Sequence, residues 1–229
     1  MKVGIIRFPG SNCDDDAWFA IVESLKEEAV MLWHKDHDLQ GADVVILPGG
    51  FSYGDYLRAG AIARFSPIMR EVAAHAGRGG IVIGICNGFQ IACEAHLLPG
   101  ALLRNDVGYR SLPVTIRVES TDSPMTSAAT VGQCLTMPIA HGEGRFTLPD
   151  AELDRLEDQA QVLFRYVDAS GQPTAAANPN GSMRNIAGIC NVGRNVVGLM
   201  PHPERAMDPL LGSRDGLVLF ESLLATVNA

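Results

Sequence analysis

Short apolar runs alternate with amphipathic stretches in the first half of the chain. KVGIIRF (2–8) and GGIVIGI (79–85) are apolar almost throughout, which is typical of parallel strands covered on both faces. Polar and apolar positions recur with a helical period over about 14–26 and 66–76. Two more strands are expected at 29–34 and 42–48. This alternation predicts an α/β fold with an open, mostly parallel sheet, helices on both faces and right-handed crossovers.

The pattern changes in the second half, where strand-like runs follow one another without long helices between them. These runs cover 112–120, 134–141, 161–168, 186–192 and 195–201. Extra antiparallel strands are therefore expected, the last two as a hairpin around Gly193 and Arg194. A final helix is predicted over about 213–227. No repeat or linker interrupts the chain, so we expect residues 1–229 to form a single domain.

Composition narrows the class of protein. A formal charge of −8 argues against nucleic acid or an anionic membrane surface as a partner. No apolar run approaches the roughly 18 residues of a membrane span. The five cysteines are scattered, odd in number and not preceded by an export signal, which favours a reduced, cytoplasmic protein with free thiols.

The segment GICNG (84–88) directly follows a predicted buried strand and opens into an apolar helix. G-x-C-x-G is the thiol counterpart of the nucleophile elbow, in which flanking glycines allow a sharp strand-to-helix turn. Cys86 would then project from the sheet at a helix N-terminus, where the dipole favours the reactive thiolate. The alternative is a buried cysteine that only packs, the commonest fate of a free thiol.

A cysteine nucleophile needs a base, and MPHPERA (200–206) supplies a candidate. Pro203 favours an extended backbone at His202, so that Glu204 would point the same way and orient the imidazole. Taken alone, this segment would be read as a surface turn with a solvated ion pair. Combined with the elbow, it predicts a Cys-His-Glu triad.

The loop PGGFSYGDY (48–56) closes the third predicted strand at the sheet edge where Cys86 is also expected. Its glycines would let backbone N–H groups approach a developing oxyanion, with the N–H of Asn87 as a second donor. Taken alone, the loop would be a glycine-rich turn.

Other kinds of site find no support in the sequence. It contains no Gly-Lys dipeptide for a Walker A loop and no G-x-G-x-x-G after a strand. Neither C-x-x-C nor H-E-x-x-H is present, so we expect no metal site. The remaining cysteines are interpreted as structural or exposed: Cys13, Cys93, Cys134 and Cys190.

Together these segments resemble the class I, triad-type glutamine amidotransferases, and more narrowly the family of small glutaminase subunits of phosphoribosylformylglycinamidine synthase. The resemblance runs from the first strand to the last helix. It is carried, in order, by FPGSNCD (8–14), PGGFSYGDYLRAGAIA (48–63), CNGFQI (86–91), LLPGALLRN (97–105), AHGEG (140–144), NPNGS (178–182), NIAGICN (185–191) and MPHPERA (200–206). It implies the flavodoxin-like fold of this class.

The resemblance also implies roles for individual residues. Cys86 would be the nucleophile, His202 its general acid and base, and Glu204 the orienting group. Residues expected to bind substrate are Gly50 and Asn87 through oxyanion N–H groups, Gln90 at the amino-acid end, and backbone around His141 and Gly142.

The implied reaction is hydrolysis of glutamine to glutamate and ammonia. Ammonia would pass to a large synthetase subunit that converts formylglycinamide ribonucleotide to formylglycinamidine ribonucleotide in purine biosynthesis. No cofactor is expected in this chain; ATP and Mg²⁺ belong to the synthetase, and a small bridging subunit is implied.

Two alternatives remain open. Cysteine hydrolases and chaperone-like relatives of this architecture carry a histidine next to the cysteine, where this chain has Asn87. A non-catalytic binding module is disfavoured by the complete triad.

Overall fold

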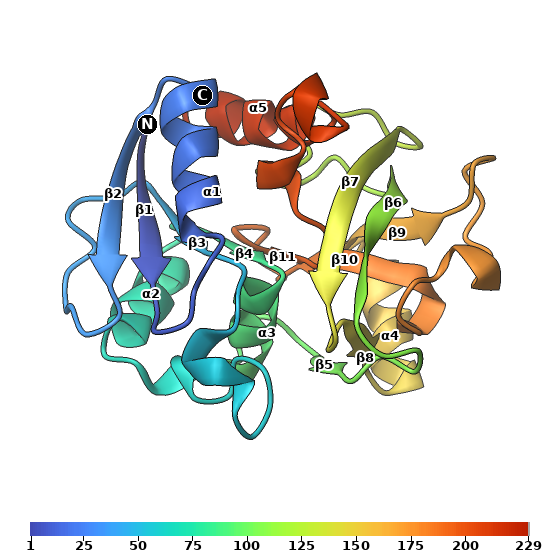
Figure 1. The fold of residues 1–229 in the computed structure, drawn as a ribbon, viewed down its shortest axis with the longest axis horizontal. Coiled ribbons are helices and arrows are strands. Elements are labelled where there is room, and N and C mark those ends of the chain that lie inside the picture. Colours follow the sequence, from blue (N-terminus) through green and yellow to red (C-terminus); the bar gives the residue numbers. More distant parts are fainter. Residues whose placement is uncertain (229) are drawn as a thin grey trace.

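A nine-stranded mixed sheet forms the centre of the computed structural model, which describes residues 1–228 (Figure 1). Its strands are β1 (Lys2–Arg7), β2 (Glu28–Trp33), β3 (Val44–Leu47), β4 (Ile81–Ile85), β6 (Arg110–Val118), β7 (Cys134–His141), β9 (Val162–Val167), β10 (Ile186–Cys190) and β11 (Val196–Leu199). They are ordered β2-β1-β3-β4-β11-β10-β9-β6-β7.

The sheet changes character at β11. Strands β2, β1, β3, β4 and β11 are mutually parallel, and from β11 through β10, β9 and β6 to β7 all pairings are antiparallel. The predicted open α/β sheet with extra antiparallel strands in the second half is thus confirmed, including the hairpin of β10 and β11. All residues of β3 are buried, as expected for a parallel strand covered on both faces.

Helices cover the parallel half of the sheet from both sides (Figure 1). Helices α1 (Asp14–Phe19) and α5 (Gly216–Val227) lie together on one side, and α2 (Ile68–Gly77) and α3 (Asn87–Glu94) lie on the other. A π-helical turn at Ala20–Ser24 extends α1, which accounts for most of the predicted first helix. Within residues 1–228, no helix has both the length and the apolar character required to cross a membrane.

One helix and two short strands were not expected from the sequence. Helix α4 (Asp150–Asp158) buries only Leu153 and Leu156, so its mostly charged sequence carries a weak apolar stripe. Strands β5 (Ala101–Leu103) and β8 (Arg145–Thr147) pair antiparallel in a separate two-stranded sheet. Strands this short have too few alternations to give a readable period.

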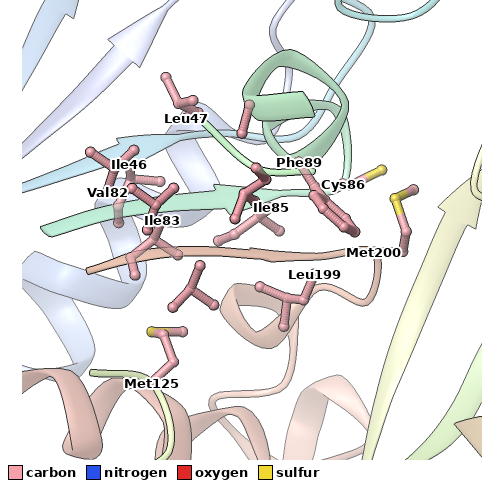
Figure 2. Close-up of a cluster of buried hydrophobic side chains, with 14 of the residues drawn as sticks. Ile46, Leu47, Val82, Ile83, Ile85, Cys86, Phe89, Met125, Leu199 and Met200 are labelled. Carbon is pink, nitrogen blue, oxygen red and sulfur yellow. The ribbon is translucent and has the colours of Figure 1, made fainter. Parts of the chain in front are cut away.

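The hydrophobic core continues to the carboxyl end of the parallel strands (Figure 2). Ile83 and Ile85 of β4 pack between side chains of β3 and β11, and Phe89 of α3 covers the end of the strand. Because β1, β3, β4 and β11 are parallel, the segments that follow them all emerge at this one edge. Four loops, distant in sequence, therefore meet there.

Candidate active site

Cys86 occupies a strained turn between β4 and α3. Its φ of 51° and ψ of −105° are rarely adopted by L residues, and such strain concentrates at functional sites. Gly84 and Gly88, to which the sequence pattern assigns the turn, have no positive φ. They instead let the helix approach the sheet, since a Cβ at Gly88 would lie 1.8 Å from the carbonyl oxygen of Leu47. The elbow has the predicted shape, with the strain on Cys86 itself.

The thiol of Cys86 lies where the parallel half of the sheet approaches β7. Its Sγ is 3.8 Å from the carbonyl oxygen of Ala140, and the residue is 4% exposed. The Cys86 N–H donates to the carbonyl oxygen of Leu199 at 2.8 Å, which ties the turn to the end of β11. In Figure 2 the sulfur projects beyond the end of β4, on the side where Met200 lies. Cys86 directly precedes the N-terminus of α3.

His202 and Glu204 form a buried pair just after β11. Nδ1 of His202 is 2.5 Å from Oε1 of Glu204, and the two residues are 1% and 3% exposed. The backbone N–H of His202 donates to the carbonyl oxygen of Pro138 at 2.9 Å. The predicted pairing is present, but by a different route: Pro203–Arg205 form a 3₁₀ turn, so the carboxylate returns to the imidazole through that turn and not by strand alternation.

The other imidazole nitrogen, Nε2 of His202, is buried and has no hydrogen-bond partner among residues 1–228. Burial favours the neutral ring, yet the charge of Glu204 and the neighbouring thiols of Cys86 and Cys13 raise the pKa of His202 well above its usual value. An imidazole held by a carboxylate on one side and facing a thiol on the other can move a proton to and from that thiol.

Cys13, which the sequence pattern left as structural or exposed, is part of this arrangement. It is buried, and its Sγ, a ring nitrogen of His202 and a carboxylate oxygen of Glu204 lie within 4.8 Å of one another. Gly49 makes this approach possible, because a Cβ there would lie 2.8 Å from the His202 ring and 3.1 Å from Cys13 Sγ. The signal in the sequence was the position of FPGSNCD after the first strand, at the shared sheet edge.

A cavity of about 150 Å³ opens next to Cys86. Four of the residues predicted to bind substrate line it: Gly50, Gln90, His141 and Gly142. Asn87 does not line it. Its side chain accepts a hydrogen bond from the Ser52 N–H (3.1 Å) and donates to Oε1 of Gln90 (2.8 Å). Asn87 thus fixes the orientation of Gln90, whose amide donates to the carbonyl oxygen of Glu143.

The protonation state of His141 follows from its partner Asn180. Oδ1 of Asn180 accepts from the Ser182 N–H at 3.0 Å, so Nδ2 is the atom 3.0 Å from Nε2 of His141. Nε2 is therefore the acceptor, and Nδ1 carries the hydrogen. Burial, and then the charge of His202, lower the pKa of His141 to about 3, so the ring is neutral. The Nδ1 hydrogen has no acceptor among the described residues.

The grouping most suited to a metal ion among residues 1–228 is Cys13, His202 and Glu204. Nη2 of Arg205 lies 3.2 Å from the Cys13 sulfur, and this positive charge disfavours a bound cation at the same place. The cluster is better suited to proton transfer than to metal binding.

The model of the CobB/CobQ-like glutamine amidotransferase domain matches residues 1–214. The phosphoribosylformylglycinamidine synthase subunit PurQ of Koribacter versatilis is 54% identical over 228 residues, covering 99% of both chains. The subunit of that name in Chlorobaculum tepidum is 58% identical over 227 residues, covering 98% of this chain and 97% of its own.

Solved structures agree with these relatives. A chain of PurLQS from Thermotoga maritima is 41% identical, with a TM-score of 0.87 over 99% of this chain and 98% of its own. A further glutamine amidotransferase from Thermotoga maritima, 16% identical with a TM-score of 0.62 over 99% of this chain and 97% of its own, shares the fold. From the match over residues 1–214 and these identities over nearly the whole length, the chain belongs to the CobB/CobQ-like glutamine amidotransferase family, among the PurQ subunits of phosphoribosylformylglycinamidine synthase.

Proposed function

We propose that this chain is the glutaminase subunit of a phosphoribosylformylglycinamidine synthase and releases ammonia from glutamine through Cys86, His202 and Glu204. The observation that carries the proposal is the buried pair of His202 and Glu204, 2.5 Å apart, beside a thiol on a strained elbow. The names of the relatives supply the reaction in which the ammonia is used.

The first half of the reaction forms a thioester. His202 takes the proton of the Cys86 thiol, and the sulfur attacks the side-chain carbonyl carbon of glutamine. Backbone N–H groups of Gly50 and Asn87 stabilise the oxyanion; one such donor typically contributes about 10²- to 10³-fold in rate. The tetrahedral intermediate collapses as the C–N bond breaks, and His202 protonates the leaving ammonia.

The second half regenerates the thiol. His202 removes a proton from water, which attacks the thioester carbonyl, and glutamate leaves as the Cys86 sulfur recovers its proton. Throughout, Glu204 holds the imidazole and stabilises its positive charge. Gln90 and the walls formed by His141 and Gly142 position the substrate.

Ammonia then passes to a large, separate synthetase subunit, which uses ATP and Mg²⁺ to convert formylglycinamide ribonucleotide to formylglycinamidine ribonucleotide. A small third subunit bridges the two, a composition that the three-letter suffix of PurLQS supports. Residues 1–229 act as a single glutamine amidotransferase domain in the cytoplasm, where the five free cysteines stay reduced.

The test is glutamate release from glutamine by the chain alone and mixed with the synthetase, ATP and formylglycinamide ribonucleotide. We expect release to rise on mixing and to vanish in Cys86→Ala, while synthesis from free ammonium survives in that variant. Loss of both activities in a properly assembled Cys86→Ala complex would refute the division of labour. Absence of glutamate release from a folded, partner-bound wild-type chain would favour a non-catalytic binding module.

A further inference from the structure

The site contains a second, smaller cavity beside His202. It measures about 50 Å³, against about 150 Å³ for the cavity beside Cys86. Of these two cavities, His202 lines only the smaller and Cys86 only the larger. They share walls formed by Gly50, Phe51, Tyr109 and Ala140. The base and the nucleophile of the triad therefore face separate spaces that meet at common walls.

The size of the smaller cavity limits what it can hold. A cavity needs roughly 10–15 Å³ of such space to accept one water molecule, and the water needs about two to four polar partners. About 50 Å³ therefore admits water. It is a third of the volume beside Cys86, so it is too small for a second amino acid.

A buried polar atom of His202 points to a ligand in this cavity. Nδ1 is held by Glu204, which lines neither cavity, so the opposite edge of the ring, with Nε2, faces the smaller one. His202 is 1% exposed, and Nε2 has no hydrogen-bond partner among residues 1–228. In the neutral ring the hydrogen lies on Nδ1, toward the carboxylate, and Nε2 is an acceptor. An O–H group in the cavity satisfies it.

Three further polar side chains line the smaller cavity: Asn12, Cys13 and Arg205. The thiol of Cys13 donates to Oδ1 of Asn12 at 3.4 Å, and Nη2 of Arg205 donates to the Cys13 sulfur at 3.2 Å. Asn12 is exposed, so it lies where solvent can reach the cavity. Together with Nε2, these groups provide the polar partners that an ordered water needs.

The shared wall at Ala140 brings the smaller cavity to the reacting atoms. Ala140 lines both cavities, and its carbonyl oxygen is 3.8 Å from the sulfur of Cys86. A γ-glutamyl group bonded to this sulfur occupies the larger cavity, with its carbonyl carbon next to the sulfur. A water in the smaller cavity can reach that carbon from the side of His202, without passing the rest of the substrate.

We propose that the smaller cavity holds the water that hydrolyses the thioester, and that Asn12 and Cys13 are positioning residues for this water. The inference rests on the proposed glutaminase function. The water oxygen attacks the thioester carbonyl carbon while one proton passes to Nε2 of His202. The C–S bond of the tetrahedral intermediate then breaks, and the sulfur takes that proton. Glutamate and the Cys86 thiol result.

The test separates the two halves of the reaction in the complex of this chain with its synthetase. In Cys13→Val an apolar and bulkier side chain displaces the water, so hydrolysis of the thioester should slow about 10- to 100-fold. The first ammonia per site is still released, because that step needs no water. The γ-glutamyl thioester should therefore accumulate, seen as a burst of ammonia and as added mass on the acid-quenched chain. Cys13→Ser, whose hydroxyl can donate and accept, should restore most of the hydrolysis.

Cys190→Val is the matched control. Cys190 is also buried and has a guanidinium nitrogen of Arg194 3.3 Å from its sulfur, but it lines neither cavity. No thioester should accumulate in this variant. If turnover falls in Cys13→Val without a thioester, Cys13 has only a structural role and the proposal is overturned.

A measurement on the wild-type complex keeps the proposal testable if Cys13→Val does not fold. O-methylhydroxylamine and O-benzylhydroxylamine attack thioesters through the same kind of nitrogen but differ in size. The smaller cavity should admit the methyl compound and disfavour the benzyl compound by at least about tenfold, relative to their ratio with a model thioester in solution. The γ-glutamyl products are quantified by mass spectrometry. Equal use of both compounds overturns the proposal.

These outcomes are distinct from failure of the proposed function. Glutamate release by the wild-type complex, with no thioester in a folded Cys13→Val complex, rejects the role of the smaller cavity and keeps the function. No glutamate release by either the wild-type or the Cys190→Val complex rejects the function itself.

Discussion

The sulfur of Cys13 lies within 4.8 Å of a ring nitrogen of His202, although Cys13 follows β1, the first strand along the chain, and His202 follows β11, the last. Burial raises the pKa of the Cys13 thiol, against the effect of His202. Cys13 therefore stays protonated near neutral pH and acts as a neutral neighbour of the imidazole. Cys86 and Cys13 are thus both neighbours of His202, and burial keeps the thiol of Cys13 protonated.

The first prediction concerns the reactivity of the cysteine thiols toward iodoacetamide, an electrophile that thiolates attack with loss of iodide. Cys86 and the exposed Cys134 should be alkylated, with Cys13 slower by about 100-fold or more because burial raises the pKa of its thiol and so lowers its thiolate fraction. Peptide mass spectrometry over a time course measures the three rates. Glutamine should protect Cys86 and leave Cys134 unaffected; alkylation of Cys13 as fast as that of Cys134 would contradict the assignment.

The second prediction concerns Glu204→Gln. The amide can still hydrogen-bond to Nδ1 of His202 but removes the charge that raises the pKa of the ring. Glutamine-dependent kcat should fall about 10²- to 10⁴-fold, as for amide substitution of a triad carboxylate elsewhere. Ammonium-dependent synthesis in the complex should be unchanged. Glu221→Gln, on the exposed side of α5, is the control, and a fall in both activities would indicate misfolding instead.

The third prediction tests the packing of the elbow. In Gly88→Ala the new Cβ would meet the carbonyl oxygen of Leu47 at 1.8 Å, which the backbone can relieve only by moving α3 off the sheet. The free energy of unfolding should fall by about 3 kcal/mol or more. Gly77→Ala, at the end of α2 with nothing within 4 Å of the new Cβ, should be neutral or more stable by up to about 1 kcal/mol. Denaturant unfolding of both variants gives the comparison.

The fourth prediction concerns stability at acidic pH. Because the folded protein holds His141 neutral, with a pKa of about 3, only the unfolded chain binds a proton there as the pH falls below about 6.5. The contribution of His141 is thus present above pH 6.5 and is lost at about 1.4 kcal/mol per pH unit down to about pH 3.

In His141→Gln, an amide oxygen can take the acceptor position of Nε2 toward Asn180. This variant should lose stability less steeply between pH 6 and 4 than wild type. Urea unfolding across that range measures both slopes. Parallel slopes would show that His141 is not buried in its neutral form.

The triad could be predicted because each of its parts is local in sequence. A glycine-flanked cysteine after an apolar run defines the elbow, and Glu204 is only two residues from His202, although a 3₁₀ turn and not strand alternation brings them together. Cys13 carries no such local signature. It reaches His202 only because loops from separate strands converge at one sheet edge, so their proximity is a tertiary property.

The same distinction holds for the fold. The long apolar runs of β1, β3 and β4 show their buried state in sequence. Helix α4 and the three-residue strands β5 and β8 do not, because their conformation is fixed mainly by what packs on them. The role of Gly84 and Gly88 was also hidden, since close approach of a helix to a neighbouring strand has no sequence pattern distinct from that of a turn.

Strand β11 is nearly the last element to be synthesised, yet it occupies the middle of the sheet, between β4 and β10. A growing chain on the ribosome therefore displays Cys86 long before His202 can join it, and the gap beside β4 cannot close until β11 emerges. Docking the late hairpin of β10 and β11 against the early strand β4 demands contacts distant in sequence, which makes folding slow. Incomplete chains consequently carry the Cys86 thiol without His202 as its base. Glutaminase chemistry becomes possible only once synthesis is almost finished.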